Sequence, residues 1–261
     1  MRPDRAARHA LRLIAITACL STPGAAWARQ SARLDATLSP ERLGSSTTVG
    51  FAFQIATAPG TVPPPLTAMQ LSYPFGLGFD LSELGLAICS TQTLETFGPH
   101  GCPANSLMGH GTAGAEIQVG PSILNETAQV TAVRTTDNNG LLALLIYASG
   151  ETPVDAQIIF PATLFPAPPP YGGRLGMTIP LVPSLPGAPD VAVVGLHVTL
   201  GPAGLTYYRR VHGHRLAYQP TGVLLPDTCP HGGFPFAATF AFQNGMRTYA
   251  RTSVPCPRHA S

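Results

Sequence analysis

The C-terminal stretch from Cys229 to Cys256 constrains the fold most, because it reads as a complete β-hairpin with a cysteine at each end. Asn244-Gly245 is the strongest two-residue hairpin signal, since a type I′ turn needs positive φ at both central positions and these residues tolerate it. Such a turn predicts that Gln243 pairs with Met246. A bend through residues 230–233 would then bring the two cysteines together.

The residues on either side of this turn alternate in character with a period of two, which is typical of strands with one buried face. We expect the buried face to carry Phe236, Phe240 and Phe242 from the incoming strand, and Met246, Thr248, Ala250, Thr252 and Val254 from the outgoing strand. The opposite face would carry Arg247, Tyr249, Arg251 and Ser253.

The rest of the chain repeats this pattern in short strand-like runs divided by Gly and Pro. Such runs predict an all-β fold of antiparallel β-sandwich units, immunoglobulin-like in general architecture. A second hairpin turn is expected at Asp137-Asn138-Asn139-Gly140. The remaining expected strands are residues 34–38, 48–57, 66–73, 112–119, 127–135, 141–148, 154–160, 174–179, 191–200 and 207–218.

Helical signals are confined to one region after the N-terminal segment. One or two short helices are expected near residues 80–97, with Asp80 or Ser82 capping the first and a further turn over residues 91–97. Because similar strand-like runs recur along the chain, we predict two β-sandwich units. The first covers residues 29–120 with the helical insertion, and the second covers residues 121–261 and ends in the cysteine-closed hairpin.

Residues 1–28 predict a secretory signal peptide, with four arginines before an apolar core at residues 13–20 and a small-x-small cleavage site at Ala26-Trp27-Ala28. An alternative is that Ile16-Thr17-Ala18-Cys19 acts as a lipobox and makes Cys19 a lipid anchor, but the apolar core before it is short. No later run reaches the roughly 20 apolar residues of a membrane span. We therefore expect a secreted or cell-envelope-associated protein without a transmembrane segment.

Cysteine usage agrees with export. Without Cys19 an even set remains, Cys89, Cys102, Cys229 and Cys256, which allows three pairings. Sequential pairing closes the shortest loops, and we predict it. A zinc site is the alternative, but neither pair has the close CxxC-type spacing of zinc ligands.

The charge of the chain disfavours an anionic macromolecule as partner. The sequence has no lysine, and after residue 28 it has eleven arginines against twelve acidic residues, so the formal charge of +2 belongs mostly to the signal peptide. Neither a nucleic acid nor an anionic membrane has electrostatic support from this balance. We predict no nucleic-acid partner.

The candidate metal ligands are His212 and His214, whose spacing would put both imidazoles on one face of a strand. A third ligand would have to come from His110, His231 or Asp227. The chain carries no nucleophile elbow, no phosphate-binding glycine loop and no complete catalytic triad. We assign no catalytic residues and expect no cofactor.

Two cysteine-containing segments carry a family resemblance. They are LGLAIC, which ends at Cys89, with CPANSLMG from Cys102, and LPDTCPHGGFPF from Leu225 with VPCP from Val254. These segments resemble a group of uncharacterised secreted proteins of high-GC actinobacteria, and the middle of the chain resembles them poorly. The resemblance implies export, β structure and disulfides, and implies no catalytic residues.

The sequence therefore predicts a secreted, non-enzymatic β protein with a cell-envelope structural, adhesive or ligand-binding role, acting on an unidentified surface or envelope ligand. The alternative is a secreted metal-dependent enzyme or metal-binding protein that uses His212 and His214.

Overall fold

Antiparallel strands make up most of the chain, which the computed structural model describes over residues 30–79, 83–150, 155–184 and 186–257. The predicted all-β class is confirmed. Among these residues no helix has the length and apolar character needed to cross a bilayer. The predicted signal peptide and Cys19 lie outside the described residues.

Twelve strands form one antiparallel sheet in the order β1-β2-β9-β4-β5-β6-β7-β8-β3-β13-β14, with β12 paired to β2. The strands are β1 Ser31–Ser39, β2 Ser46–Ala56, β3 Leu66–Pro74, β4 Leu107–Val119, β5 Ser122–Arg134, β6 Ala143–Gly150, β7 Ala156–Pro166, β8 Tyr171–Thr178, β9 Ala192–Leu200, β12 Val223–Leu224, β13 Phe234–Phe242 and β14 Arg247–Val254. A separate two-stranded ribbon consists of β10 Tyr207–Val211 and β11 His214–Tyr218.

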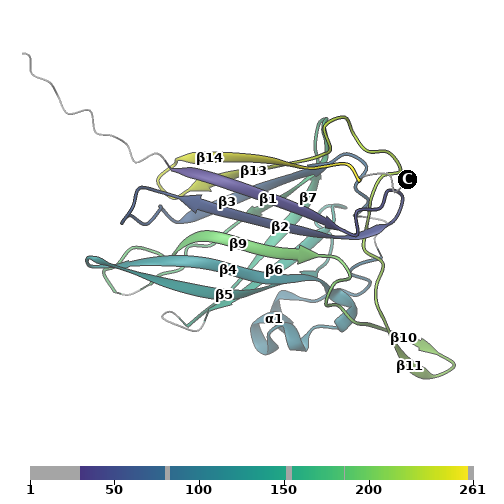
Figure 1. The fold of residues 1–261 in the computed structure, drawn as a ribbon. Coiled ribbons are helices and arrows are strands. Elements are labelled where there is room, and N and C mark those ends of the chain that lie inside the picture. Colours follow the sequence, from purple (N-terminus) through teal and green to yellow (C-terminus); the bar gives the residue numbers. More distant parts are fainter. Residues whose placement is uncertain (1–29, 80–82, 151–154, 185, 258–261) are drawn as a thin grey trace, which may run out of the picture.

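The large sheet curls until its first and last strands, β1 and β14, lie side by side (Figure 1). The fold is thus nearly barrel-like, where the sequence predicted sandwiches. The long strands β4 and β5 pair with neighbours along both edges, so the sheet has no break at which it would divide into two layers. Curling also brings the two edge strands together, which shields their unpaired backbone groups.

Strands from before and after residue 120 are interleaved in this sheet. The strand β2 pairs with β9, and β3 pairs with both β8 and β13. The division into units at residues 29–120 and 121–261 stays a prediction, which limited proteolysis of residues 29–261 would test.

The main core fills the interior of the curled sheet. The β13 side chains predicted to face inward are buried there, and the Phe240 ring lies 4.8 Å from that of Phe53 on β2. On the other face of the hairpin, Arg247, Tyr249 and Arg251 are exposed. The predicted assignment of the two faces is confirmed.

The register of this hairpin differs from the prediction by one residue. Phe242, not Gln243, pairs with Met246, and the Phe242 N–H donates to the Met246 carbonyl at 3.0 Å. The loop therefore has three residues, and Gly245 takes a φ of 82°. A three-residue hairpin loop needs a left-handed residue at its last position alone. Asn244 instead accepts a hydrogen bond from the Met246 N–H through its side chain, at 3.0 Å.

The second predicted hairpin turn is confirmed. Asn138 and Leu141 form a bridge, and the two residues between them take the positive φ values of a type I′ turn, 52° at Asn139 and 79° at Gly140. This turn connects β5 to β6.

The helical region contains α1, Thr91–Phe97, followed by two single turns of 3-10 helix, Pro99–Gly101 and Ala104–Ser106. Ser90 caps α1 by accepting a hydrogen bond from the Thr93 N–H. Asp80 and Ser82, the two predicted cap residues, lie outside the described residues. The prediction of an earlier helix that starts at either residue is wrong over residues 83–90, because these residues are not helical. Here the Cys89 N–H donates to the Arg134 carbonyl at 2.8 Å, a tertiary bond that favours extended backbone.

Both predicted disulfides are present. Cys89 and Cys102 have a Cα separation of 5.4 Å, and Cys229 and Cys256 one of 5.8 Å. The first holds α1 on the outer face of the sheet, where Leu94 packs in a small second core with residues of β5 and β6. The second uses the predicted bend, in which the Gly233 N–H donates to the Pro230 carbonyl at 3.0 Å.

Candidate ligand-binding site

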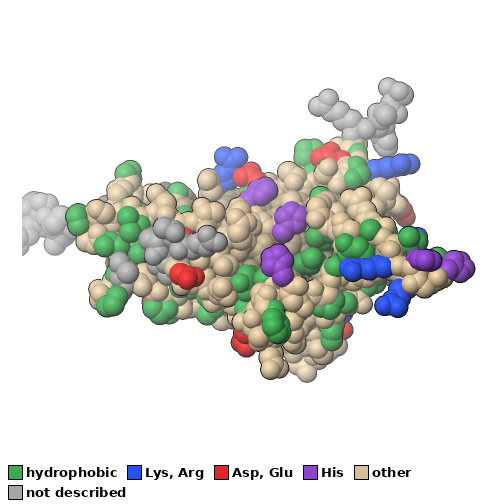
Figure 2. Space-filling model, turned by 90° about the horizontal axis from the view of Figure 1, so that it is seen from below, with side chains coloured by type: hydrophobic (Ala, Val, Ile, Leu, Met, Phe, Trp, Pro, Cys, Tyr) green, Lys and Arg blue, Asp and Glu red, His purple; other side chains and the backbone are tan. Residues whose placement is uncertain are grey.

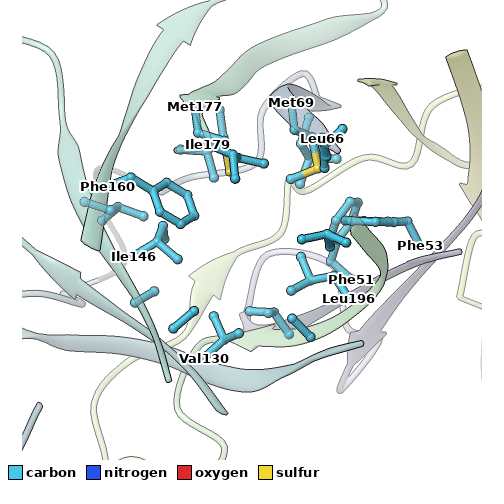
Figure 3. A pocket seen from close by; sticks show the side chains of 18 of the residues that line it. Phe51, Phe53, Leu66, Met69, Val130, Ile146, Phe160, Met177, Ile179 and Leu196 are labelled. Carbon is cyan, nitrogen blue, oxygen red and sulfur yellow. The ribbon is translucent and has the colours of Figure 1, made fainter. Parts of the chain in front are cut away.

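A cavity of about 110 Å³ lies inside the curled sheet. Strands β2 to β9 contribute to its wall, and the labelled side chains in Figure 3 point into it from several directions. Its lining is entirely apolar and consists of Phe51, Phe53, Leu66, Met69, Leu71, Ala113, Val130, Ala132, Leu144, Ile146, Ala148, Ile158, Phe160, Leu175, Met177, Ile179, Val193, Leu196, Val198 and Leu200.

The cavity exists because several inward positions carry small side chains. Ala113 on β4, Ala132 on β5 and Ala148 on β6 each contribute only a methyl group to the wall, where most lining positions carry larger residues. Native cores are close-packed, with few voids larger than a water molecule. Apolar cavities of about 150 Å³ stay dry and take up small apolar molecules such as benzene. This space therefore suits an apolar guest better than water.

Two smaller cavities continue this space. One of about 70 Å³ shares Ala113, Ala148, Ile158 and Val193 with the central cavity, and one of about 30 Å³ shares Phe51, Leu71, Leu144, Leu175 and Leu200 with it. Because the two shared sets have no member in common, the small cavities adjoin the central one at different places. Three small adjoining spaces suit a slender chain better than a fused ring system.

One carboxylate lies among the residues that line these three cavities. Glu126 on β5 is buried beside the 70 Å³ cavity, opposite Ala115 of β4. The central cavity has no polar lining group.

Comparisons of the chain with protein-family models, with curated proteins and with solved structures found no match. The function is therefore inferred from the geometry of the cavity and of the surface.

The structure places the two candidate metal ligands in the small ribbon, not on one strand. The prediction of a single strand over residues 207–218 is wrong, because His212 and Gly213 form a two-residue turn with φ values of 50° and 82° between β10 and β11. His212 is thus a turn residue, and His214 begins β11 as the partner of Val211. The spacing that predicted two imidazoles on one strand face reflects a type I′ turn.

A complete metal site is not formed by the described residues. They contain no group of three His, Cys, Asp or Glu side chains placed to hold an ion. His110, proposed as a third ligand, is exposed on β4, far from the ribbon in sequence and beside Gly204 in space. Metal binding by His212 and His214 stays a prediction.

The base of the ribbon is held firmly. The buried hydroxyl of Tyr207 accepts a hydrogen bond from the Gly85 N–H at 2.8 Å and donates one to the Leu107 carbonyl. Asn105 makes two hydrogen bonds of 2.8 Å to the backbone of Tyr208. Burial raises the pKa of Tyr207, because a phenolate there would lose its hydration.

Sequence reasoning missed the cavity. A usable signal was present in the small residues at alternate positions of single strands, such as Ala113 and Ala115 on β4 and Ala148 and Gly150 on β6. Period-two alternation shows which face is inward. A small side chain on the inward face leaves space between opposing strands.

Proposed function

We propose that the protein is exported and acts, without catalysis, by holding a slender apolar ligand, a single hydrocarbon chain, inside the curled sheet. The observation that carries the proposal is the unfilled central cavity with a wholly apolar lining. Each methylene group moved from water into such a space gains about 0.8 kcal/mol. The two disulfides suit an oxidising compartment outside the cytoplasm.

Of the roles expected from sequence, ligand binding is therefore favoured over an envelope-structural or adhesive role. A purely structural β protein gains stability from complete packing, and an internal void lowers it. Retaining small side chains at several inward positions has a stability cost that ligand binding offsets. Membership of the actinobacterial secreted group remains part of the proposal.

The test is a titration of the mature chain with the slender apolar probe 1-dodecanol, monitored by isothermal titration calorimetry. Ala148 lines both the 110 Å³ and the 70 Å³ cavities, so Ala148→Leu fills the space where they join. The matched control is Ser149→Leu, which adds bulk one position along the same strand, on its opposite face.

We expect saturable binding to the wild-type chain, at least a tenfold weaker affinity for Ala148→Leu, and less than a twofold change for Ser149→Leu. Thermal melts of the three proteins establish that each is folded. Absence of saturable binding, or equal affinities for the two leucine variants, would contradict the proposal.

A further inference from the structure

The ribbon β10–β11 concentrates positive charge at one end of the molecule. Three of the eleven arginines after residue 28, together with two histidines, lie within residues 207–218, which contain no Asp or Glu. The ribbon projects from the body in Figure 1, and Figure 2 shows blue and purple side chains gathered on it. Net charge averages over the whole surface, so the balance of the whole chain conceals this patch.

The arrangement of the arginines is unfavourable for the isolated protein. Arg210 lies directly opposite Arg215 across the ribbon, and like charges in that position destabilise a strand pair. Within the described part of the chain, Arg209, Arg210 and Arg215 form no ion pair. An external anion would relieve this repulsion.

Tyrosine rings hold two of these guanidinium groups in place. The Arg215 guanidinium lies 3.6 Å from the ring centroid of Tyr208, and that of Arg209 lies 5.4 Å from the centroid of Tyr218. Stacking uses the face of a guanidinium group and leaves its N–H donors at the edge. These donors suit the oxygens of a phosphate group, which arginine binds in bidentate geometry.

Exposed apolar side chains adjoin the basic ones. Leu216, on the ribbon, is 45% exposed, and Leu86 and Ile88 are 59% and 58% exposed. Asn105 connects the ribbon to the segment that contains Leu86 and Ile88. Its backbone carbonyl accepts a hydrogen bond from the Ala87 N–H at 3.1 Å, and its side chain hydrogen-bonds to the ribbon backbone at Tyr208. The apolar residues therefore lie beside the base of the ribbon.

From this combination we propose that the ribbon, with Leu86 and Ile88 beside it, docks the protein on a membrane surface that contains anionic phospholipids. The arginines bind lipid phosphates, and the exposed aliphatic side chains enter the interfacial layer. Tyrosine is favoured at the same depth, where one end of the ring is apolar and the other wet. A soluble polyanion would match the arginines but would leave the apolar residues exposed. This docking function goes beyond the binding of a ligand in the cavity.

The experiment is co-sedimentation of the mature chain with vesicles of phosphatidylcholine, with or without 30% phosphatidylglycerol. The test variant is Arg209→Gln/Arg210→Gln/Arg215→Gln. Each basic residue near an anionic surface contributes about a fivefold gain in partitioning, so this triple variant should bind about a hundredfold more weakly. Leu216→Ser should weaken binding several-fold without a change in charge.

The matched control removes the same charge elsewhere, as Arg33→Gln/Arg247→Gln/Arg251→Gln on the exposed faces of β1 and β14. Arg251 also stacks on a tyrosine, Tyr249, at 4.6 Å from the ring centroid, so the control loses the same kind of contact. Its binding should stay within a few-fold of wild type. Binding of 1-dodecanol without vesicles should be equal in all variants, which separates this proposal from the cavity function.

Three results would overturn the proposal. The first is equal binding to vesicles with and without phosphatidylglycerol, and the second is an equal loss of vesicle binding in the two triple variants. The third is that dextran sulfate, a soluble polyanion, fully displaces the protein from vesicles while Leu216→Ser binds them as wild type does. The last result would identify the ribbon as a site for a soluble polyanion. Circular dichroism melts check that each variant is folded.

Discussion

At the scale of single residues, Phe240 is the side chain on which the core of the C-terminal hairpin most depends. It is fully buried and packs on Phe53 of β2 across the interior. Phe240→Ala should lower the free energy of unfolding by about 3–5 kcal/mol, the sum of lost apolar transfer and a new cavity. Arg247→Ala and Arg251→Ala, on the exposed face, should each stay within about 0.5 kcal/mol of wild type. Urea unfolding measures all three, and equal losses would mean that the faces are assigned wrongly.

Tyr207 gives a prediction that depends on pH. Tyr207→Phe leaves the Gly85 N–H and the Leu107 carbonyl without their partner and should cost about 1–3 kcal/mol at pH 8. Burial raises the pKa of Tyr207 in the folded chain above its ordinary value of 10.0, so the unfolded chain releases this proton first.

The stability that Tyr207 contributes should therefore be complete below pH 10 and should be lost as the pH rises through the folded pKa. Denaturant unfolding from pH 8 to pH 11 should show the difference between wild type and Tyr207→Phe shrinking above pH 10. The exposed Tyr249→Phe serves as control and should differ from wild type by less than about 0.5 kcal/mol at pH 8. A Tyr207 difference that stays constant up to pH 11 would contradict the buried placement of its hydroxyl.

At the scale of elements, most strands could be predicted because period-two alternation is a local property. The β5–β6 turn was also predictable, since both central residues tolerate positive φ. The partners of β2 and β3 could not be predicted, because β2 pairs with β9 and β3 with β13 across more than a hundred residues. Such pairings depend on how all the inward faces pack together, which no local pattern contains.

In two hairpins, a sequence motif that fits one local structure adopts another. Asn244-Gly245 suits a two-residue turn, but the chain uses the glycine in a three-residue loop and the asparagine as a side-chain acceptor. His212-Gly213-His214 suits a pair of metal ligands on a strand, but its first two residues form the turn between β10 and β11. In both cases a glycine with positive φ stands in the turn, and the register of the turn depends on the strands around it.

The ribbon should be dispensable for folding. Its residues from Arg209 to Leu216 are mostly exposed, and the anchoring contacts lie at Tyr207 and Tyr208. Replacing residues 209–216 by Asn-Gly would join Tyr208 to Ala217, which already face each other across the ribbon. The free energy of unfolding should change by no more than about 1 kcal/mol. A loss above 2 kcal/mol in urea unfolding would show that the ribbon supports the fold.

At the scale of the whole molecule, the sequence predicts an all-β protein with two disulfides but not the near closure of its sheet. Closure follows from the meeting of β1 and β14, which lie at opposite ends of the chain and carry no signal for each other. The cavity follows in turn, because it is a property of side chains that face one another only after closure. Ala148 and Met177 line one space although they lie on different, non-adjacent strands.

The central claim is that the interior holds an apolar chain, and methionine methyl groups report on it directly. Met69 and Met177 line the central cavity, whereas Met246 packs on the core from the hairpin and is not among the lining residues. Methyl spectra of residues 29–261 labelled with ¹³C-methyl methionine, titrated with 1-dodecanol, should show saturable shifts of Met69 and Met177 and an unmoved Met246 signal. Spectra in which the two cavity methionines do not respond, or in which Met246 shifts equally, would contradict the claim.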